Sequence, residues 1–474
     1  MGRRELSVEK EYRLCYNYLR SNRANDKISG GLFYMNTKVI LSFDTEDFTS
    51  SRAADGILNS VRILEHNGVR GCFAIVGYLA RQLLAWKRFD VIEALQRHEI
   101  DFHTLGHSMH PSICEYTDKE DYQKALEEML IQESMGLGMI KSVFDVDTLY
   151  ASVPPGVSQS YVAMYGYRKL GLRIYADSAC TTEDCTPVFC AGQLHLSYYL
   201  SLEALYEELK DKIDYDAILD MIAKRRYAVL YHHPNKGIFK DFWDALNYNK
   251  ENLCEYGKWK ISEEQPQVWQ DGFYHFFDEL LRRIKADDRF SFTTYQEVAE
   301  SASAEVQITK DMLPQMRDHI IKQIEPMQDP AISLSEMFAA ACAFAKGETS
   351  CTPRDTYGFL SKPIGITESV TVDAADVLRA ARAIDCTTFL PTEIKVGTAL
   401  LGPADFLCAL LRALCGEKRI LLSPRSQLNS IDAFPRLKDL CLKGAWLFSD
   451  TLEDRYLSER FRLQCWTIKY PAKL

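Results

Sequence analysis

The 474-residue sequence lacks two features that would place the protein in a membrane or on a nucleic acid. Its longest apolar runs, such as residues 73–80 and 337–345, fall well short of the roughly 20 apolar residues that a membrane helix needs. It also lacks an excess of positive charge, because its formal net charge is −10 at pH 7. A broad nucleic-acid surface must be basic. The sequence therefore predicts no membrane span and no nucleic-acid partner.

Other absences concern location and cofactors. The first 30 residues contain no apolar segment of the kind found in secretory signals. The 14 cysteines include no CxxC pair and no evenly counted framework of the kind that forms disulfides. No GxGxxG or GKS/GKT motif follows an expected strand, so nothing indicates a nucleotide site. We expect a cytoplasmic protein with reduced cysteines.

The chain is longer than one domain needs, and its pattern of apolar and polar residues changes near residue 303. Residues 1–34 form a polar extension. From residue 35 to residue 302, short apolar runs alternate with amphipathic helical patterns, which predicts parallel strands with helices outside. The runs expected to be strands are residues 39–43, 71–76, 100–104, 149–153, 172–176, 193–199, 227–232 and 290–294. This number of strands favours an α/β barrel over an open sheet.

Residues 303–474 are expected to form a mainly helical domain in which a short pattern recurs. SLSEMFAA at residue 333, DAADVLRA at residue 373 and GPADFLCA at residue 402 each place a small or polar residue and an acid ahead of an apolar helix. The first and third copies continue alike, as CAFAKGE and LRALCGE. An internal repeat is favoured over a chance likeness of two amphipathic helices. We expect this region to bind or assemble, with a protein as one kind of partner.

The stretch VILSFDTEDFTS at residues 39–50 ends a buried strand in three acids, Asp44, Glu46 and Asp47. A second stretch, IDFHTLGH, ends another expected strand in His103 and His107, a spacing at which two imidazoles can reach one metal. In a parallel α/β barrel the carboxyl ends of all strands face one side, where active sites form. One carboxylate and two imidazoles with an open position are the ligand set of a catalytic zinc or similar ion.

Three further stretches lie at expected strand ends. YAVLYHHPNKG ends in His232 and His233, and only one of these neighbours can enter the site because adjacent strand residues face opposite sides. LYASVPPGVSQS breaks at Pro154 and Pro155 into a shaped loop. RIYADSACTTEDC places Asp177 at a strand end, where a turn cap is one interpretation.

Together these stretches resemble the NodB-type polysaccharide deacetylases of carbohydrate esterase family 4, over about residues 36–300. HEIDFHTLGHSMHP is similar to the family's H-E-I-x-x-H-T/S-x-x-H-x-x-x-P pattern, SFDTEDF to the branch with D-x-E-D, and LYHHP to the closing motif. The resemblance implies a distorted (β/α)7 barrel and a divalent metal, zinc in our expectation.

The resemblance also implies roles for single residues. His103, His107 and one acid, Glu46 in preference to Asp47, would hold the metal, while Asp47 would otherwise be a turn acid. Asp44 would be the general base and His233 the general acid that protonates the leaving amine. Pro154, Pro155 and Asp177 would line the substrate site, where Asp177 would orient a site histidine as the family's fourth motif does.

The chain departs from the family at the proline loop, which reads Ser-Val-Pro-Pro-Gly and lacks the arginine that pairs with the catalytic acid. Arg168 or Lys169, on the next expected helix, could supply that charge.

Three functions fit the sequence. The first is metal-dependent removal of acetyl groups from N-acetylated amino sugars or from a small N-acyl metabolite. The second is hydrolysis of carbon–nitrogen bonds in non-sugar amides, as in allantoinase-like relatives. The third is a catalytically silent barrel kept as a carbohydrate-binding or assembly module, which the missing arginine supports.

Overall fold

The protein is described here from a computed structural model that covers residues 36–471, apart from residues 157, 177, 178, 251, 355, 446 and 449. The predicted polar extension at residues 1–34 and the candidate substrate residue Asp177 therefore lie outside the described residues.

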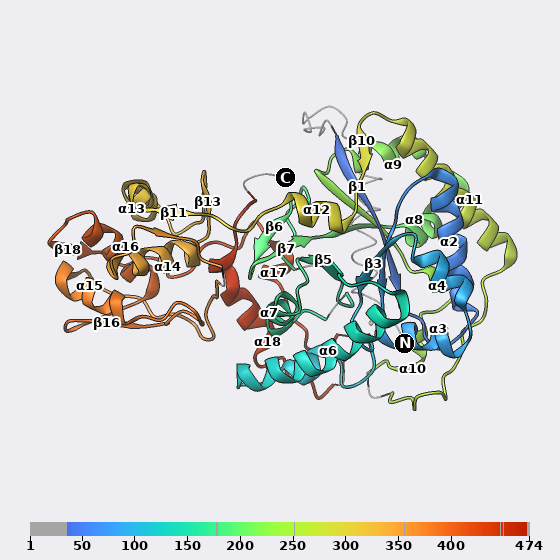
Figure 1. Ribbon diagram of the computed structural model, residues 1–474, viewed down its shortest axis with the longest axis horizontal. Helices are drawn as coiled ribbons and strands as arrows, with labels where there is room; N and C mark the ends of the chain where they lie inside the picture. Colours follow the sequence, from blue (N-terminus) through green and yellow to red (C-terminus); the bar gives the residue numbers. More distant parts are fainter. Residues whose placement is uncertain are drawn as a thin grey trace.

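A ten-stranded sheet forms the centre of the first part of the chain (Figure 1). In spatial order its strands are β6 (Val188–Cys190), β7 (Gln193–Leu196), β5 (Ile174–Ala176), β4 (Ala151–Ser152), β3 (Glu99–Phe102), β2 (Cys72–Ile75), β1 (Thr37–Thr45), β9 (Tyr227–His232) and β8 (Tyr198–Ser201), with β10 (Phe290–Phe292) paired to β1. Neighbouring strands are parallel except β6 and β7. Each apolar run predicted as a strand overlaps at least one of these strands.

β6 was not predicted, and β7 and β8 replace the single strand predicted over residues 193–199. β6 and β7 form an antiparallel hairpin whose two-residue turn, Ala191 and Gly192, has positive φ at both positions. Such turns match strand twist, but Ala-Gly is a weak signal beside Asn-Gly or Asp-Gly. At Ser197 the chain leaves β7 and enters β8 at the other end of the spatial order. No hydrogen-bonded strand pair joins β6 or β7 to β8 within the described residues, so the sheet is curled but open there.

Helices surround this sheet, most of them on its outer side, while α12 (Tyr295–Ser301) contributes Tyr295 and Val298 to the inner layer (Figure 1). The others are α2 (Ala53–Asn67), α3 (Gly77–Ala85), α4 (Phe89–Leu95), α5 (Ile113–Thr117), α6 (Tyr122–Phe144), α7 (Tyr161–Lys169), α8 (Leu202–Leu209), α9 (Tyr215–Ile222), α10 (Trp243–Asn247) and α11 (Gln267–Ala286). The predicted α/β class is therefore correct. In the described part of the chain, no helix is both long enough and apolar enough to cross a membrane.

Two apolar layers hold this part together. The larger lies between the sheet and the helices and includes Phe73, Leu83 and Phe277. A smaller one fills the inside of the curl and includes Ile40, Ala74 and Val229. Because strand residues alternate between the two sides, every second residue of a strand points into the curl. Polar residues at those positions are enclosed by the sheet, which is how the candidate site acquires buried charges.

The part beyond residue 303 combines helices with short strand pairs, so a mainly helical domain is not confirmed. Its elements are β11 (Ile308–Thr309), α13 (Leu313–Lys322), β12 (Met327–Gln328), β13 (Ala331–Ile332), α14 (Leu334–Ala345), β14 (Ser350–Cys351), β15 (Val370–Asp373), α15 (Ala374–Ala383), β16 (Ile394–Val396), β17 (Ala399–Leu401), α16 (Pro403–Leu414), β18 (Arg419–Leu422), α17 (Pro435–Lys438) and α18 (Leu457–Arg462). Helices α14, α15 and α16 begin directly after Ser333, Asp373 and Gly402, as the recurring pattern predicts.

These elements occur in the same order twice. The unit strand–helix–hairpin–helix–strand runs from β11 to β14 and again from β15 to β18. In each unit the first and last strands pair antiparallel, and the middle two strands form a hairpin. The repeated element order supports a duplicated unit of about half this part of the chain.

The end of the chain returns to the sheet. Phe189 of β6 and Lys469 exchange backbone hydrogen bonds of 2.8 and 3.0 Å. The hydroxyl of Tyr165 on α7 donates to Gln464 Oε1 over 2.7 Å, and Trp466 is fully buried against Phe359 and Phe338. A single apolar core therefore runs from the sheet into the C-terminal units.

Candidate metal centre and active site

The carboxyl ends of β1, β3 and β9 bring the predicted site residues together. Asp44 is near the end of β1 and Glu46 follows it, His103 follows β3, and His233 follows β9. These three strands run parallel, so their carboxyl ends share one edge of the sheet.

Glu46, His103 and His107 form a compact cluster of metal-ligand atoms. One donor atom of each lies within 4.8 Å of the other two. The Oε2 atom of Glu46 is 2.8 Å from His107 Nε2 and 3.4 Å from His103 Nε2. All three side chains are almost fully enclosed. Two imidazoles and one carboxylate fit a divalent ion of the zinc type, with room for a further ligand.

Further contacts fix the orientation of each ligand. The Nδ1 atom of His103 hydrogen-bonds the carbonyl of Val153, which directly precedes the proline loop. The Nδ1 atom of His107 hydrogen-bonds the hydroxyl of Ser108, which donates to Asp244 Oδ2 over 2.6 Å. With Nδ1 engaged, each imidazole presents Nε2 to the cluster.

Glu46 is also held in place. The indole Nε1 of Trp243 donates to Glu46 Oε1 over 3.2 Å, which leaves Oε2 facing the histidines. Burial opposes the charge of Glu46, but His107 and His103 lower its pKa well below the usual value. Glu46 is therefore ionised, as a metal ligand must be.

Ser108→Ala is expected to weaken metal binding about 10–100-fold, the usual cost of losing an outer partner of a ligating histidine. The variant removes the hydrogen bond to His107 Nδ1 while leaving the ligands intact. Competition with a metal-binding dye measures the affinity. Ser335→Ala is the matched control, because this buried serine donates to Tyr357 in the C-terminal part. Equal affinity of the Ser108 variant and the parent would contradict the supporting role.

Asp47 points away from the cluster. Its Oδ1 accepts hydrogen bonds from the backbone N–H of Thr49 over 2.8 Å and from the Thr49 hydroxyl over 2.6 Å. Burial raises the pKa of Asp47 to about 7. The sequence left the choice of metal ligand open between Glu46 and Asp47. The structure places Glu46 beside the histidines, whereas Asp47 is hydrogen-bonded within its own turn.

Asp44 lies beside the cluster and faces His233. Its Oδ2 is 3.4 Å from His233 Nε2, and its Oδ1 accepts a hydrogen bond from the Tyr198 hydroxyl. Ser42 Oγ lies 2.9 Å from the same hydroxyl. The residue that steadies Asp44 is therefore Tyr198, a neutral donor from β8, and it was not predicted because this contact joins residues 154 positions apart and leaves no local signal in the sequence.

Neither cation suggested as a replacement for the missing arginine reaches Asp44. Arg168 Nη1 donates to the carbonyl of Ala191 over 2.7 Å, and its guanidinium lies over the rings of Tyr165 and Tyr357. Lys169 is exposed to solvent. This part of the prediction is wrong, because α7 presents these side chains to the C-terminal part of the chain and to water.

Glu203, at the start of α8, is a site residue that the sequence did not reveal. Its Oε1 lies 2.5 Å from His233 Nδ1, and its Oε2 lies 2.9 Å from His232 Nδ1. In the sequence, Glu203 follows Ser201 as an ordinary first-turn acid of a capped helix. Only its tertiary position shows that it holds both histidines. As expected, one of the pair enters the site: His232 is fully buried, and His233 faces Asp44.

The proline loop is buried beside the site. Pro154 and Pro155 are enclosed, and the carbonyl of Pro155 accepts a hydrogen bond from the N–H of Ser158 over 2.6 Å. Their predicted contact with substrate, and that of Asp177, stays a prediction.

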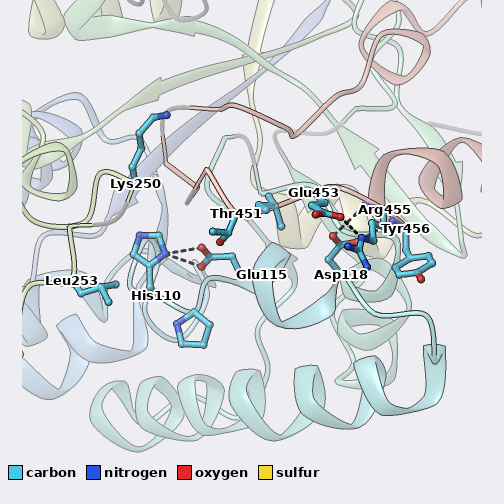
Figure 2. Close-up of a pocket in the computed structure, with 11 residues that line it drawn as sticks. His110, Glu115, Asp118, Lys250, Leu253, Thr451, Glu453, Arg455 and Tyr456 are labelled. Carbon is cyan, nitrogen blue, oxygen red and sulfur yellow. Dashed lines mark hydrogen bonds and ion pairs between the residues drawn. The ribbon is translucent and has the colours of Figure 1, made fainter.

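A cavity of about 650 Å³ is lined on one side by His110, Glu115 and Asp118 (Figure 2). Figure 2 shows His110 paired with Glu115, whose carboxylate lies 2.8 Å from His110 Nδ1. The opposite wall is residues 451–456, and Asp118 anchors it by accepting backbone hydrogen bonds from Arg455 and Tyr456, of 3.1 and 2.9 Å. Residues near position 455 thus border this cavity together with the segment that follows β3.

Solved structures similar to this chain include deacetylases, esterases and pseudoenzymes of carbohydrate esterase family 4, the family that the motifs resemble. A protein from Mycobacterium smegmatis described as a polysaccharide deacetylase shares 16% identity at a TM-score of 0.38, covering 58% of this chain and 92% of its own. An acetyl xylan esterase from Clostridium thermocellum, in complex with a cobalt ion, shares 13% at a TM-score of 0.30, covering 55% and 90%. A family 4 pseudoenzyme from Bacillus anthracis shares 10% at a TM-score of 0.30, covering 56% and 66%.

No family model matches the sequence, and no curated protein does. At these identities and TM-scores, function must be argued from the site itself.

Proposed function

We propose that the protein is a metal-dependent hydrolase that removes acetyl groups from N-acetylated amino sugars. The observation that carries the proposal is the buried Glu46–His103–His107 cluster with Asp44 and His233 beside it. A carboxylate base, an imidazole acid and a divalent-metal ligand set in one place form a complete set for amide hydrolysis.

A divalent metal at this cluster, zinc in our proposal, would supply Lewis-acid chemistry toward the acetyl carbonyl. Asp44 takes the proton of the attacking water through Oδ2, which lies beside His233, because Oδ1 is engaged by the Tyr198 hydroxyl. His233 donates a proton from Nε2 to the leaving amine, since Nδ1 is engaged by Glu203. Glu203 is a positioning residue that keeps the imidazole oriented and charged.

The charge on His233 is the electrostatic support for this assignment. Burial opposes a protonated imidazole, but the carboxylates of Glu203, Glu46 and Asp44 outweigh it and raise the pKa of His233 to about 10. At neutral pH the residue therefore carries the proton that a general acid must give. The same contacts depress the pKa of Glu203, which stays ionised.

Glu203→Gln is expected to move the alkaline limb of the pH profile to lower pH by about 1–3 units. Activity that needs protonated His233 falls as pH rises through its pKa, and glutamine removes the carboxylate that raises that pKa most. The measurement is kcat/KM against pH. Glu207→Gln, on the exposed side of the same helix, is the control and should leave the profile unchanged. An unshifted limb in the Glu203 variant would refute this role.

The substrate class and the role of the C-terminal units are also proposed. An amino sugar within a longer glycan would extend from the cluster toward the cavity at His110 and residues 451–456. The duplicated units beyond residue 303 would bind a carbohydrate chain or a protein partner, since the site residues all come from the first part of the chain.

The function is tested by assaying acetate release from N-acetylated monosaccharides and oligosaccharides with the full chain loaded with Zn²⁺ or Co²⁺. We expect release in the loaded protein, loss on chelation and recovery on adding metal back. Bound metal without release from any sugar would overturn the deacetylase proposal and favour a catalytically silent carbohydrate-binding protein. Acetate release only from non-sugar N-acyl amides would show that the protein is an amide hydrolase of that substrate class instead of a sugar deacetylase.

A further inference from the structure

A second group of chemically reactive side chains lies inside the curled sheet, toward the amino ends of its strands. Cys72 begins β2, Glu99 and Asp101 lie on β3, and Tyr295 begins α12. Glu99 and Asp101 are two residues apart in a strand, so they project from the same side. Cys72, Asp101 and Tyr295 are fully buried and Glu99 is 3% exposed.

The donor atoms of this group are arranged as a ligand set. The sulfur of Cys72 and one oxygen each of Glu99 and Asp101 lie within 4.8 Å of one another. The N–H of Ala151 donates to Asp101 Oδ1 over 2.9 Å, and the N–H of Gln296 donates to Glu99 Oε1 over 2.7 Å. Backbone amides thus hold one oxygen of each carboxylate and leave Glu99 Oε2 and Asp101 Oδ2 available to a ligand. Hydrogen bonds of this kind orient the ligating side chains around a metal.

The remaining oxygens have no donor. Within the described residues, Glu99 Oε2, Asp101 Oδ2 and the hydroxyl of Tyr295 are buried and meet no hydrogen-bond partner. The two carboxylates interact with each other, and Thr294 and the charge of Arg70 act on Glu99, but no cation of the described residues forms an ion pair with either. Buried carboxylate oxygens without partners are costly, so they call for a cation or a proton.

We propose that Cys72, Glu99 and Asp101 bind a divalent metal ion of the zinc type, distinct from the candidate catalytic metal. A thiolate with carboxylates suits Zn²⁺ or Co²⁺, which accept sulfur and oxygen together. The ion would be structural, since the group is closed off from water, and would tie β2 to β3 beneath the site that carries His103. A single proton held between Glu99 and Asp101 is the competing way to neutralise the pair.

The metal content of the protein distinguishes a bound metal ion from a proton shared by Glu99 and Asp101. The His103→Ala/His107→Ala double variant of the full chain removes the candidate catalytic site and should retain one metal ion per chain, against two in the parent. A folded double variant that binds no metal overturns the proposal, whatever the parent binds. This readout does not depend on hydrolytic activity, so it stands or falls separately from the proposed function.

Cobalt loading identifies the ligand. The double variant loaded with Co²⁺ should show a sulfur-to-cobalt charge-transfer band in the near ultraviolet, because the catalytic cluster contains no sulfur. Adding Cys72→Ser should abolish the band, whereas adding Cys114→Ser, at another buried cysteine, should keep it. A band that survives Cys72→Ser, or no band in the folded double variant, refutes the site. If the Cys72→Ser protein does not fold, the metal content and the charge-transfer band of the double variant still test whether a sulfur-ligated ion is bound.

Discussion

Replacement of His103 by alanine is expected to remove metal from the candidate active site and to lower acetate release by at least about 10³-fold. The metal's charge stabilisation in hydrolysis is worth several kcal/mol, and each 1.36 kcal/mol is a factor of ten in rate. His103 is one of only two imidazoles in the cluster, and its Nε2 faces Glu46 at 3.4 Å. Metal analysis and the acetate assay on the same preparation measure both losses.

Two comparisons make the His103 result interpretable. His107→Ala should show the same double loss, because it removes the other imidazole of the cluster. His66→Ala, at an exposed histidine on α2, should keep metal and activity. Acetate release that persists in a folded, metal-free His103 variant would show that the cluster is not the catalytic centre.

Replacement of Asp44 by asparagine is expected to lower kcat by about 10²–10⁴-fold while metal remains bound. Asparagine has the same shape and can still accept the hydrogen bond from the Tyr198 hydroxyl, so the change removes the base rather than the local structure. KM and metal content should stay near those of the parent, because Asp44 is outside the ligand cluster. Steady-state kinetics with saturating metal measures the loss.

Asp47→Asn is the matched control for Asp44→Asn. The two acids lie three positions apart in one strand end, yet Asp47 accepts its hydrogen bonds from Thr49 within its own turn. We expect the Asp47 variant to keep most of its activity. A loss in Asp47→Asn as large as that in Asp44→Asn would reverse the division of roles between these acids.

Local chemistry made much of the site predictable. Acids and histidines directly after apolar runs stand out in the sequence, and parallel strands must bring their carboxyl ends to one edge. Asp44, Glu46, His103 and His233 could therefore be found from their positions after strands. The helix starts at Ser333, Asp373 and Gly402 were readable for a similar reason, since capping depends on neighbours only a few residues away.

Residues that act through distant contacts could not be found in this way. Tyr198 and Glu203 come from β8 and α8, and nothing in their own neighbourhood distinguishes a catalytic support from an ordinary strand tyrosine or a helix-start acid. The suggestion that Arg168 replaces the missing arginine was wrong because proximity in sequence to the proline loop does not fix which way a helix presents a side chain.

The sequence by itself determined the α/β class, the strands that carry the site and the kinds of side chain available at their ends, because strand burial and helix capping are properties of short segments. Only the tertiary structure decided which acid meets the histidines, which neutral hydroxyl steadies Asp44, and where the last residues of the chain return to the sheet. These are outcomes of packing, in which strand order and sheet curl set distances between residues more than 100 positions apart.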